Sequence, residues 1–97
     1  MSNNIDTTLA ERGARYGTFA GHAEISQRLK GMIQHFAAVR ACDLAPDQSE
    51  ALNMIAHKIA RILNGDPDYV DSWVDIAGYA KLVADRLEIE NHQSTTI

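Results

Sequence analysis

The sequence has little of several features that would point to a specific class of protein. Cys42 is its only cysteine, which excludes an intramolecular disulfide and a cysteine-rich structural zinc site. No apolar run approaches the ~18 residues of a membrane span. Residues 1–4 show no basic segment followed by an apolar run, so we expect no secretory leader. We therefore expect a protein of the reducing cytoplasm.

Basic charge and metal-binding patterns are also scarce. Nine Lys and Arg stand against thirteen Asp and Glu, which gives a net charge of −4. Proteins that bind nucleic acid usually present a basic face, so neither nucleic acid nor an anionic membrane surface is an expected partner. The four histidines occur neither as His-x-x-x-His nor as His-Glu-x-x-His, so we expect no zinc site.

The sequence does contain strong helical periodicity and no strand pattern. It predicts one all-α domain over residues 1–97, a small bundle of about four helices, with flexible tails at residues 1–5 and 89–97. Gly17, Pro46 and the pair Asn64-Gly65 are typical helix boundaries, and Asp6 and Asp68 are typical N-caps. The expected helices run over residues 7–16, from 19 or 22 to about 41, 46–64, and from 69 to about 88.

Apolar residues recur at helical spacing in each of the last three helices and predict their core faces. The helix at residues 46–64 is apolar on more than one side, so we expect the bundle to form a homo-oligomer. The predicted core residues are Ile25, Leu29, Met32, Ile33, Phe36 and Val39, then Leu52, Ile55, Ile59 and Ile62, then Trp73, Ile76, Ala77, Ala80, Val83, Ala84 and Leu87.

The last two helices form an antiparallel hairpin, because only a short Gly-Asp-Pro turn separates them. Positions equally far from the turn then face each other, which pairs Arg61 with Asp71 and Lys58 with Asp75. One interpretation is a pair of structural salt bridges. The other is a site for a small charged ligand, in which the cations hold a phosphate and Asp71 and Asp75 bind Mg²⁺.

Two further groups of side chains admit a functional interpretation. Arg12, Arg15, Tyr16 and Phe19 could hold a nucleotide through phosphate contacts and stacking, or they could be surface arginines beside packed rings. A polar stripe along the third helix reads as a solvated face or as a partner surface. That stripe consists of Glu50, Asn53, His57, Arg61 and Asn64.

Two motifs carry a resemblance to a known family. Residues 11–19 read ERGARYGTF, and residues 54–82 read MIAHKIARILNGDPDYVDSWVDIAGYAKL. Together they resemble a family of small proteins of unassigned function encoded by tailed phages and bacterial prophages. The resemblance covers most of residues 8–87 and implies a phage or prophage origin with action in the cytoplasm of the bacterial host. It transfers no activity and no catalytic residue.

A more distant similarity links the sequence to the all-α nucleoside triphosphate pyrophosphohydrolases of the MazG type. Those proteins are helical bundles that hold Mg²⁺ through a Glu-Glu-x-x-Glu and a Glu-x-x-Asp motif. Here the second helix offers only Glu24, and the fourth offers Asp71 and Asp75. The carboxylates are too few for the motif, which argues against hydrolysis and leaves binding without catalysis open, and Mg²⁺ is the one cofactor the similarity suggests.

Three functional hypotheses follow, from three classes. The first is a module that binds a nucleotide or nucleotide signal through Lys58, Arg61, Asp71 and Asp75, with Arg15 and Tyr16 as further contacts. The second is an interaction protein that binds and alters a host bacterial protein. The third is a Mg²⁺-dependent nucleotide pyrophosphohydrolase.

Overall fold

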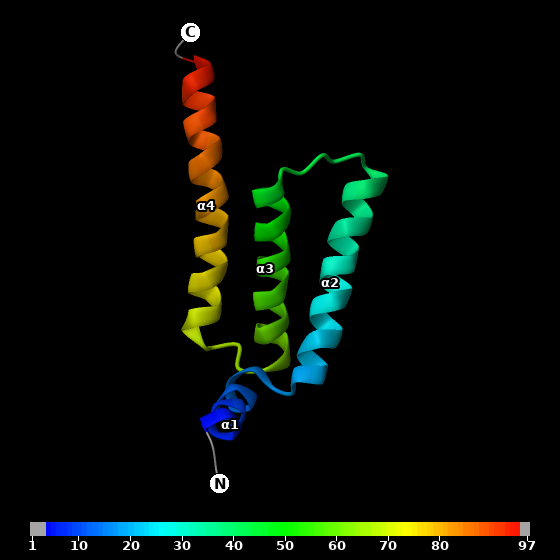
Figure 1. Ribbon diagram of the computed structural model, residues 1–97, viewed down its shortest axis with the longest axis vertical. Coiled ribbons are helices and arrows are strands. Elements are labelled where there is room, and N and C mark those ends of the chain that lie inside the picture. Colours follow the sequence, from blue (N-terminus) through cyan, green and yellow to red (C-terminus); the bar gives the residue numbers. More distant parts are fainter. Residues whose placement is uncertain (1–3, 96–97) are drawn as a thin grey trace.

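The computed structural model describes the backbone of residues 4–95 and the side chains of residues 4–91. Over this range the chain is all-α, as the periodicity predicts, with no strand. The four helices are α1 (Asn4–Tyr16), α2 (Phe19–Val39), α3 (Pro46–Asn64) and α4 (Val70–Thr95) (Figure 1).

Three helix boundaries lie where the sequence predicts them. Gly17 separates α1 from α2 in the left-handed region, with a φ of +78°, which glycine adopts without strain. Thr18 caps α2, because its hydroxyl accepts a hydrogen bond from the Gly21 N–H at 3.1 Å. Pro46 is the first residue of α3, and Asn64 is its last.

Other helix ends differ from the prediction. Helix α1 begins at Asn4, so Asp6 lies inside its first turn and is not its N-cap. Helix α4 begins at Val70 because Asp68 belongs to the preceding turn, where its N–H donates to the Asp66 carboxylate at 2.9 Å. Helix α2 ends at Val39, short of residue 41.

The second predicted tail is largely helical. Helix α4 continues to Thr95, beyond its predicted end near residue 88. An ion pair between Arg86 and Glu90, one turn apart at 3.0 Å, supports the helix across that point. Residues 1–3 and 96–97 of the predicted tails lie outside the described residues, whereas residues 4–5 and 89–95 are helical.

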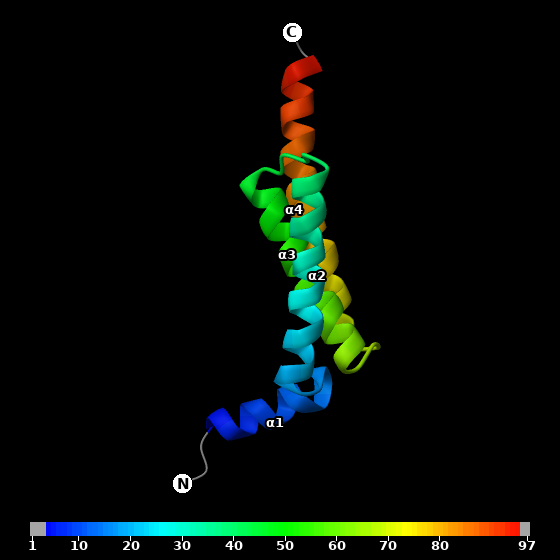
Figure 2. The ribbon, with the colours of Figure 1, turned by 90° about the vertical axis from the view of Figure 1, so that its right-hand side faces the viewer.

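Helices α2, α3 and α4 stand side by side in one layer, with α3 in the middle (Figure 1). Within the described chain, α2 and α4 each contact α3 and do not contact one another. Turned by 90°, the three overlap as a thin column, and α1 projects from one side of its lower end (Figure 2). Helix α1 touches α2 and α3 only, and none of its residues is buried.

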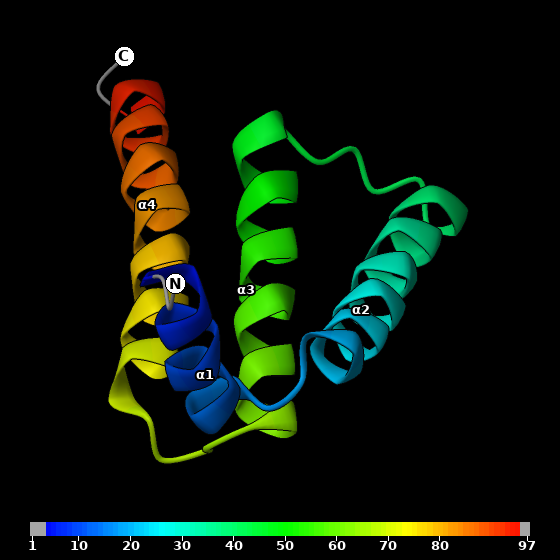
Figure 3. The ribbon, with the colours of Figure 1, turned by 60° about the horizontal axis from the view of Figure 1, so that its bottom comes forward.

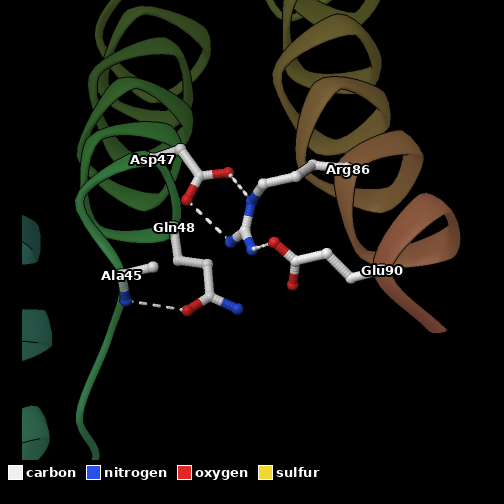
Figure 4. A network of polar contacts seen from close by, with 5 residues as sticks. All are labelled: Ala45, Asp47, Gln48, Arg86 and Glu90. Carbon is white, nitrogen blue, oxygen red and sulfur yellow. Dashed lines mark hydrogen bonds and ion pairs between the residues drawn. The ribbon is translucent and has the colours of Figure 1, made fainter. Parts of the chain in front are cut away.

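A salt bridge clamps the upper part of α4 to the start of α3 (Figure 4). Arg86 donates to both carboxylate oxygens of Asp47, at 2.6 and 2.7 Å, and also to Glu90. The hydrogen bond from Arg86 holds the pKa of Asp47 below its usual range. Beside this pair the Gln48 side chain accepts from the Ala45 N–H at 2.9 Å and caps α3. The predicted antiparallel hairpin is therefore fixed at its open end.

The core of this layer is small. Among the described residues, the buried apolar side chains are Ala51, Ala56, Ala60 and Ile62, all on α3, and no large side chain is fully buried. Trp73 is 54% exposed, although its spacing predicts a core position, because α4 contacts only α3. Its indole N–H donates to the Pro67 carbonyl at 2.8 Å. The layer therefore leaves about half of its predicted core residues exposed.

Candidate functional site

The two sequence motifs meet at one corner of the molecule, where the α1–α2 link crosses the end of α3 (Figure 3). The Asn64 side-chain amide donates to the carbonyls of Tyr16 and Thr18, at 2.7 and 2.8 Å. The Asp66 N–H donates to the Arg15 carbonyl at 2.7 Å. The Arg15 and Tyr16 carbonyls lie in the last turn of α1, which leaves them without helical partners. The bonds from Asp66 and Asn64 therefore help to set where α1 sits.

Glycines make this close approach possible. A Cβ on Gly17 would collide with the backbone of Asn64, and a Cβ on Gly21 would meet the Asn64 amide. A Cβ on Gly65 would collide with the backbone of Arg15 and Tyr16. Gly17 of the first motif and Gly65 of the second therefore have a packing cause, which is the contact between two backbones.

Alternating arginines and tyrosines line one side of the corner. The Arg61 guanidinium carbon lies 4.4 Å from the centre of the Tyr16 ring. Tyr16 meets Tyr69 edge to face at 5.9 Å, and Arg15 covers Tyr69 at 5.0 Å. The Tyr69 hydroxyl donates to Asp71 at 2.8 Å. Cation–π contacts of this kind orient the arginines without neutralising their charge.

A cavity of about 340 Å³ opens at the corner between α1, α2 and α3, and we call it the corner cavity. Its volume lies within the usual range for small-ligand sites. Basic and aromatic side chains from three helices converge on it. Its lining consists of Leu9, Arg12, Gly13, Tyr16, Gly17, Thr18, Phe19, His22, His57 and Arg61.

Buried polar atoms without partners lie at and beside this cavity. His22 is only 6% exposed, and its Nδ1 has no hydrogen-bond partner within the protein. The Ser26 hydroxyl and the Asn53 amide oxygen, also buried, have none either. The His22 and His57 rings stack edge to face with centroids 4.5 Å apart. Buried polar groups are nearly always satisfied. The contact between α2 and α3 beside the cavity, which we call the seam, therefore has capacity for water or for a ligand.

Several cationic side chains surround the seam. Burial lowers the pKa of His57 to about 4, with His22, Arg61, Lys30 and Lys58 acting in the same direction. Burial and the nearby cations lower the pKa of His22 as well. Both imidazoles are therefore neutral at neutral pH. Among the described residues, Arg12, Lys30 and Arg61 form no ion pair with a carboxylate.

The residues of the predicted hairpin site do not come together as one group. Lys58 and Asp75 form the predicted salt bridge at 2.9 Å, with the Lys58 side chain 12% exposed. The predicted pair of Arg61 and Asp71 is wrong, because Arg61 lies against Tyr16 and Asp71 accepts from Tyr69. Tyr16, at the end of α1, contacts Arg61, and Tyr69, in the α3–α4 turn, contacts Asp71. Of the residues assigned to a ligand, Arg61 and Tyr16 line the corner cavity.

The polar stripe on α3 has a different environment from the solvated face that the sequence suggests. Asn53, His57 and Asn64 are partly buried against α2 and the corner. His22 and Lys30 approach His57 from α2, and Lys30 Nζ lies 3.4 Å from its Nδ1. The sequence held a signal for this seam, since residues 22, 26 and 30 and residues 53, 57 and 61 are polar at four-residue spacing on two neighbouring helices.

The carboxylates suggested for Mg²⁺ already have partners. Asp71 accepts from Tyr69, and Asp75 pairs with Lys58. In the described part of the chain, no three residues among His, Cys, Asp and Glu are placed to hold one metal ion. The corner cavity itself offers donors and cations, which suit an anion better than a bare cation.

None of the helices in residues 4–95 is both long and apolar enough to cross a membrane.

Comparison with known proteins identifies a family for this chain. No curated protein and no solved structure matches the chain. Residues 3–87 match the family described as Domain of unknown function (DUF6378), a range that holds both motifs and the whole corner. The chain therefore belongs to this uncharacterised family.

Proposed function

We propose that this protein binds a nucleotide, or a nucleotide signal, in the corner cavity. The observation that carries the proposal is that Arg12 and Arg61, which form no ion pair with a carboxylate among the described residues, line a cavity that is also lined by aromatic rings. In a chain with a net charge of −4, such a cluster is unusual. Unneutralised cations beside a cavity attract an anion of matching size.

The phosphate end of the ligand would lie against Arg61, Arg12 and the two imidazoles. An arginine offers a planar pair of N–H donors that suits a phosphate oxygen pair. A neutral imidazole can donate one N–H as well, and His22 Nδ1 has no partner within the protein. The cations around His57 repel one another, and an anion bound here would reduce that repulsion.

The base would stack on Phe19. This ring is 82% exposed at the edge of the cavity, which is an unfavourable place for phenylalanine unless something covers it. One neighbour of the Tyr16 ring is Arg61, so Phe19 is the more accessible of the two rings. Stacking of a base on an aromatic side chain contributes ~1–3 kcal/mol and tolerates any base. The cavity therefore selects for a phosphate more strongly than for one base.

The setting we propose is a phage or prophage protein that acts in the cytoplasm of the bacterial host. Its support is the resemblance of the two motifs, which form the corner. Sequestration or sensing of a host nucleotide needs no catalytic group, and the proposal assigns none. Binding of a host protein without a small ligand is the alternative that the same setting allows.

Thermal melting against a panel of nucleotides, with and without Mg²⁺, tests the proposal. A ligand at 100 times its Kd stabilises by ~2.7 kcal/mol, which raises the midpoint by roughly 10 °C or more for a domain of this size. We expect such a shift with a nucleotide and none with the matching nucleoside, which lacks phosphate. No shift with any nucleotide would reject the proposal and favour the host-protein alternative.

A further inference from the structure

The layer of α2, α3 and α4 has an uncovered apolar face on the side away from the corner cavity. A helix packed in a single layer can bury only the sides that face its neighbours, and stable domains normally use two layers. The sequence predicts a core stripe on each of these helices, yet much of the stripes on α2 and α4 is exposed, as is Leu52 on α3. Exposed members include Met32, Phe36, Val39, Leu52 and Trp73, and Leu63 of α3 is exposed as well.

The arrangement of α3 shows which face this is. His57 and Arg61 line the corner cavity together with residues of α1, and α1 projects from one side of the layer (Figure 2). At about 100° per residue, Leu52, Ile59 and Leu63 lie roughly 120–160° around α3 from His57. These three side chains therefore lie on the opposite face of the layer.

The stripes of the two outer helices continue the same face. On α2, Lys30 reaches His57 on the cavity side, and residues 25, 32 and 36 lie roughly 120–160° around the helix from Lys30. On α4, Ala80 and Val83 share a groove with Leu52 and Ile55 of α3. The stripes at residues 25, 29, 32, 36 and 39 and at 73, 77, 80, 84 and 87 each repeat with the 4-3-4-3 spacing of helices that pack against other helices.

The chain exposes more surface than a compact monomer of its mass. The accessible surface is 7159 Å², whereas a compact monomer of 10.7 kDa exposes about 5,500 Å². The radius of gyration is 17.1 Å, against about 12.5 Å for a compact domain of 97 residues. The difference of about 1,650 Å² includes surface of α1 and of the outer side of α4, so we assign half of it to this face. Two copies that each covered that half would bury about 1,650 Å² in total, which is the size of a standard stable interface.

We infer that a second copy of this chain covers the apolar face, layer against layer, in a twofold dimer. The face carries no charged residue in its three stripes, so two copies meet there without bringing like charges together. A twofold axis pairs the same patch on both chains, and its helices supply the second layer that each chain lacks. The corner cavity lies on the other face, so the dimer leaves it open and the inference does not depend on the ligand.

Sedimentation velocity on the full chain from 1 to 100 µM tests this inference. We expect twice the 10.7 kDa of one chain. Phe36→Glu places a carboxylate in the interface, and we expect at least a ~100-fold weaker dimer because a buried unpaired charge is strongly unfavourable. Gln34→Glu adds the same charge to an exposed position on α2 outside the stripe, and we expect the dimer to be retained. Helical circular dichroism of both variants checks that they remain folded.

Trp73 gives a second readout that needs no variant, since it is the only tryptophan and belongs to the α4 stripe. We expect acrylamide to quench its fluorescence less as the parent protein is concentrated and the dimer forms. A monomer at 100 µM would overturn the inference. A dimer that Phe36→Glu leaves intact, or that Gln34→Glu weakens equally, would overturn it too. So would a dimer in which the quenching of Trp73 does not change.

Discussion

The imidazole rings of His22 and His57 stack edge to face, 4.5 Å apart, in the lining of a cavity that also holds Arg12 and Arg61. Two histidines in such surroundings stay neutral because burial disfavours the charged imidazolium, and the nearby cations lower the two pKa values further. The contact joins α2 to α3 at the corner where α1 is attached. It therefore links the stability of the layer to the electrostatics of the proposed ligand site.

Acidification should destabilise the free protein between pH 6.5 and about 4. The pKa of His57 is about 4 in the folded chain and 6.5 without burial. In this range the unfolded chain binds more protons than the folded one, so the free energy of unfolding falls as the pH falls. Lys30, Lys58 and Arg61 act on His57 in the same direction. Urea denaturation at a series of pH values measures the slope.

Removal of His57 should flatten that slope. We expect His57→Gln to lose much of the dependence between pH 6.5 and 4, whereas His35→Gln, at an exposed position on α2, should keep it. Equal slopes for the parent and His57→Gln would show that the seam does not hold this imidazole neutral.

Arg61→Gln should weaken nucleotide binding by about 10- to 100-fold, because a charge-assisted hydrogen bond contributes ~1.5–3 kcal/mol. Calorimetric titration with the nucleotide that gives the largest melting shift measures the change. The matched control is Arg28→Gln, which alters an exposed arginine paired with Glu24 on α2. Equal losses in the two variants would mean that only the overall charge matters and that the cavity is not the site.

Gly17→Ala should destabilise the fold by more than ~1–2 kcal/mol. The left-handed φ of +78° alone costs about that much for a residue with a Cβ, and the Cβ would also collide with Asn64. Gly31→Ala is the matched control, since a Cβ there meets nothing within 4 Å and α2 should gain ~0.5–1 kcal/mol. Thermal or urea unfolding measures both. A Gly17→Ala protein as stable as the parent would contradict the packing described for the corner.

The salt bridge of Lys58 and Asp75 should matter for stability and not for ligand binding. Asp75→Asn leaves a mostly buried cation without its partner, so we expect a loss of ~1–3 kcal/mol, toward the lower end because the Asp75 side chain is 45% exposed. Lys58→Met should cost less, since an apolar side chain of similar length replaces the buried charge. Nucleotide affinity should change less than in Arg61→Gln. A larger loss of affinity than in Arg61→Gln would show that the ligand binds at the hairpin and not in the corner cavity.

Local signals in the sequence predict most of the fold. Gly17, Pro46 and Asn64 mark helix ends because their backbone preferences act within one turn. The pair of Lys58 and Asp75 is predictable because both lie at fixed distances from one short turn. The end of α4 is not predictable in the same way, because the pairing of Arg86 with Asp47 depends on a distant helix.

The candidate site is predictable only in part. Arg61 and Tyr16 are identified from the two motifs, but their contact with each other depends on how α1 docks through Asn64. His22 and His57 belong to different helices, and neither fits a known spacing motif. Their meeting depends on the relative rotation of α2 and α3, which hydrophobic periodicity fixes only loosely when so few large apolar side chains are buried.

Imidazole proton resonances recorded during a nucleotide titration test the central claim most directly. His22 and His57 line the corner cavity, whereas His35 lies farther along α2 beside Phe36 and serves as an internal reference. We predict that a nucleotide shifts the ring signals of His22 and His57 and raises their pKa values, while His35 does not move. Signals of His22 and His57 that stay unchanged at saturating nucleotide would contradict the claim that this cavity is a nucleotide site.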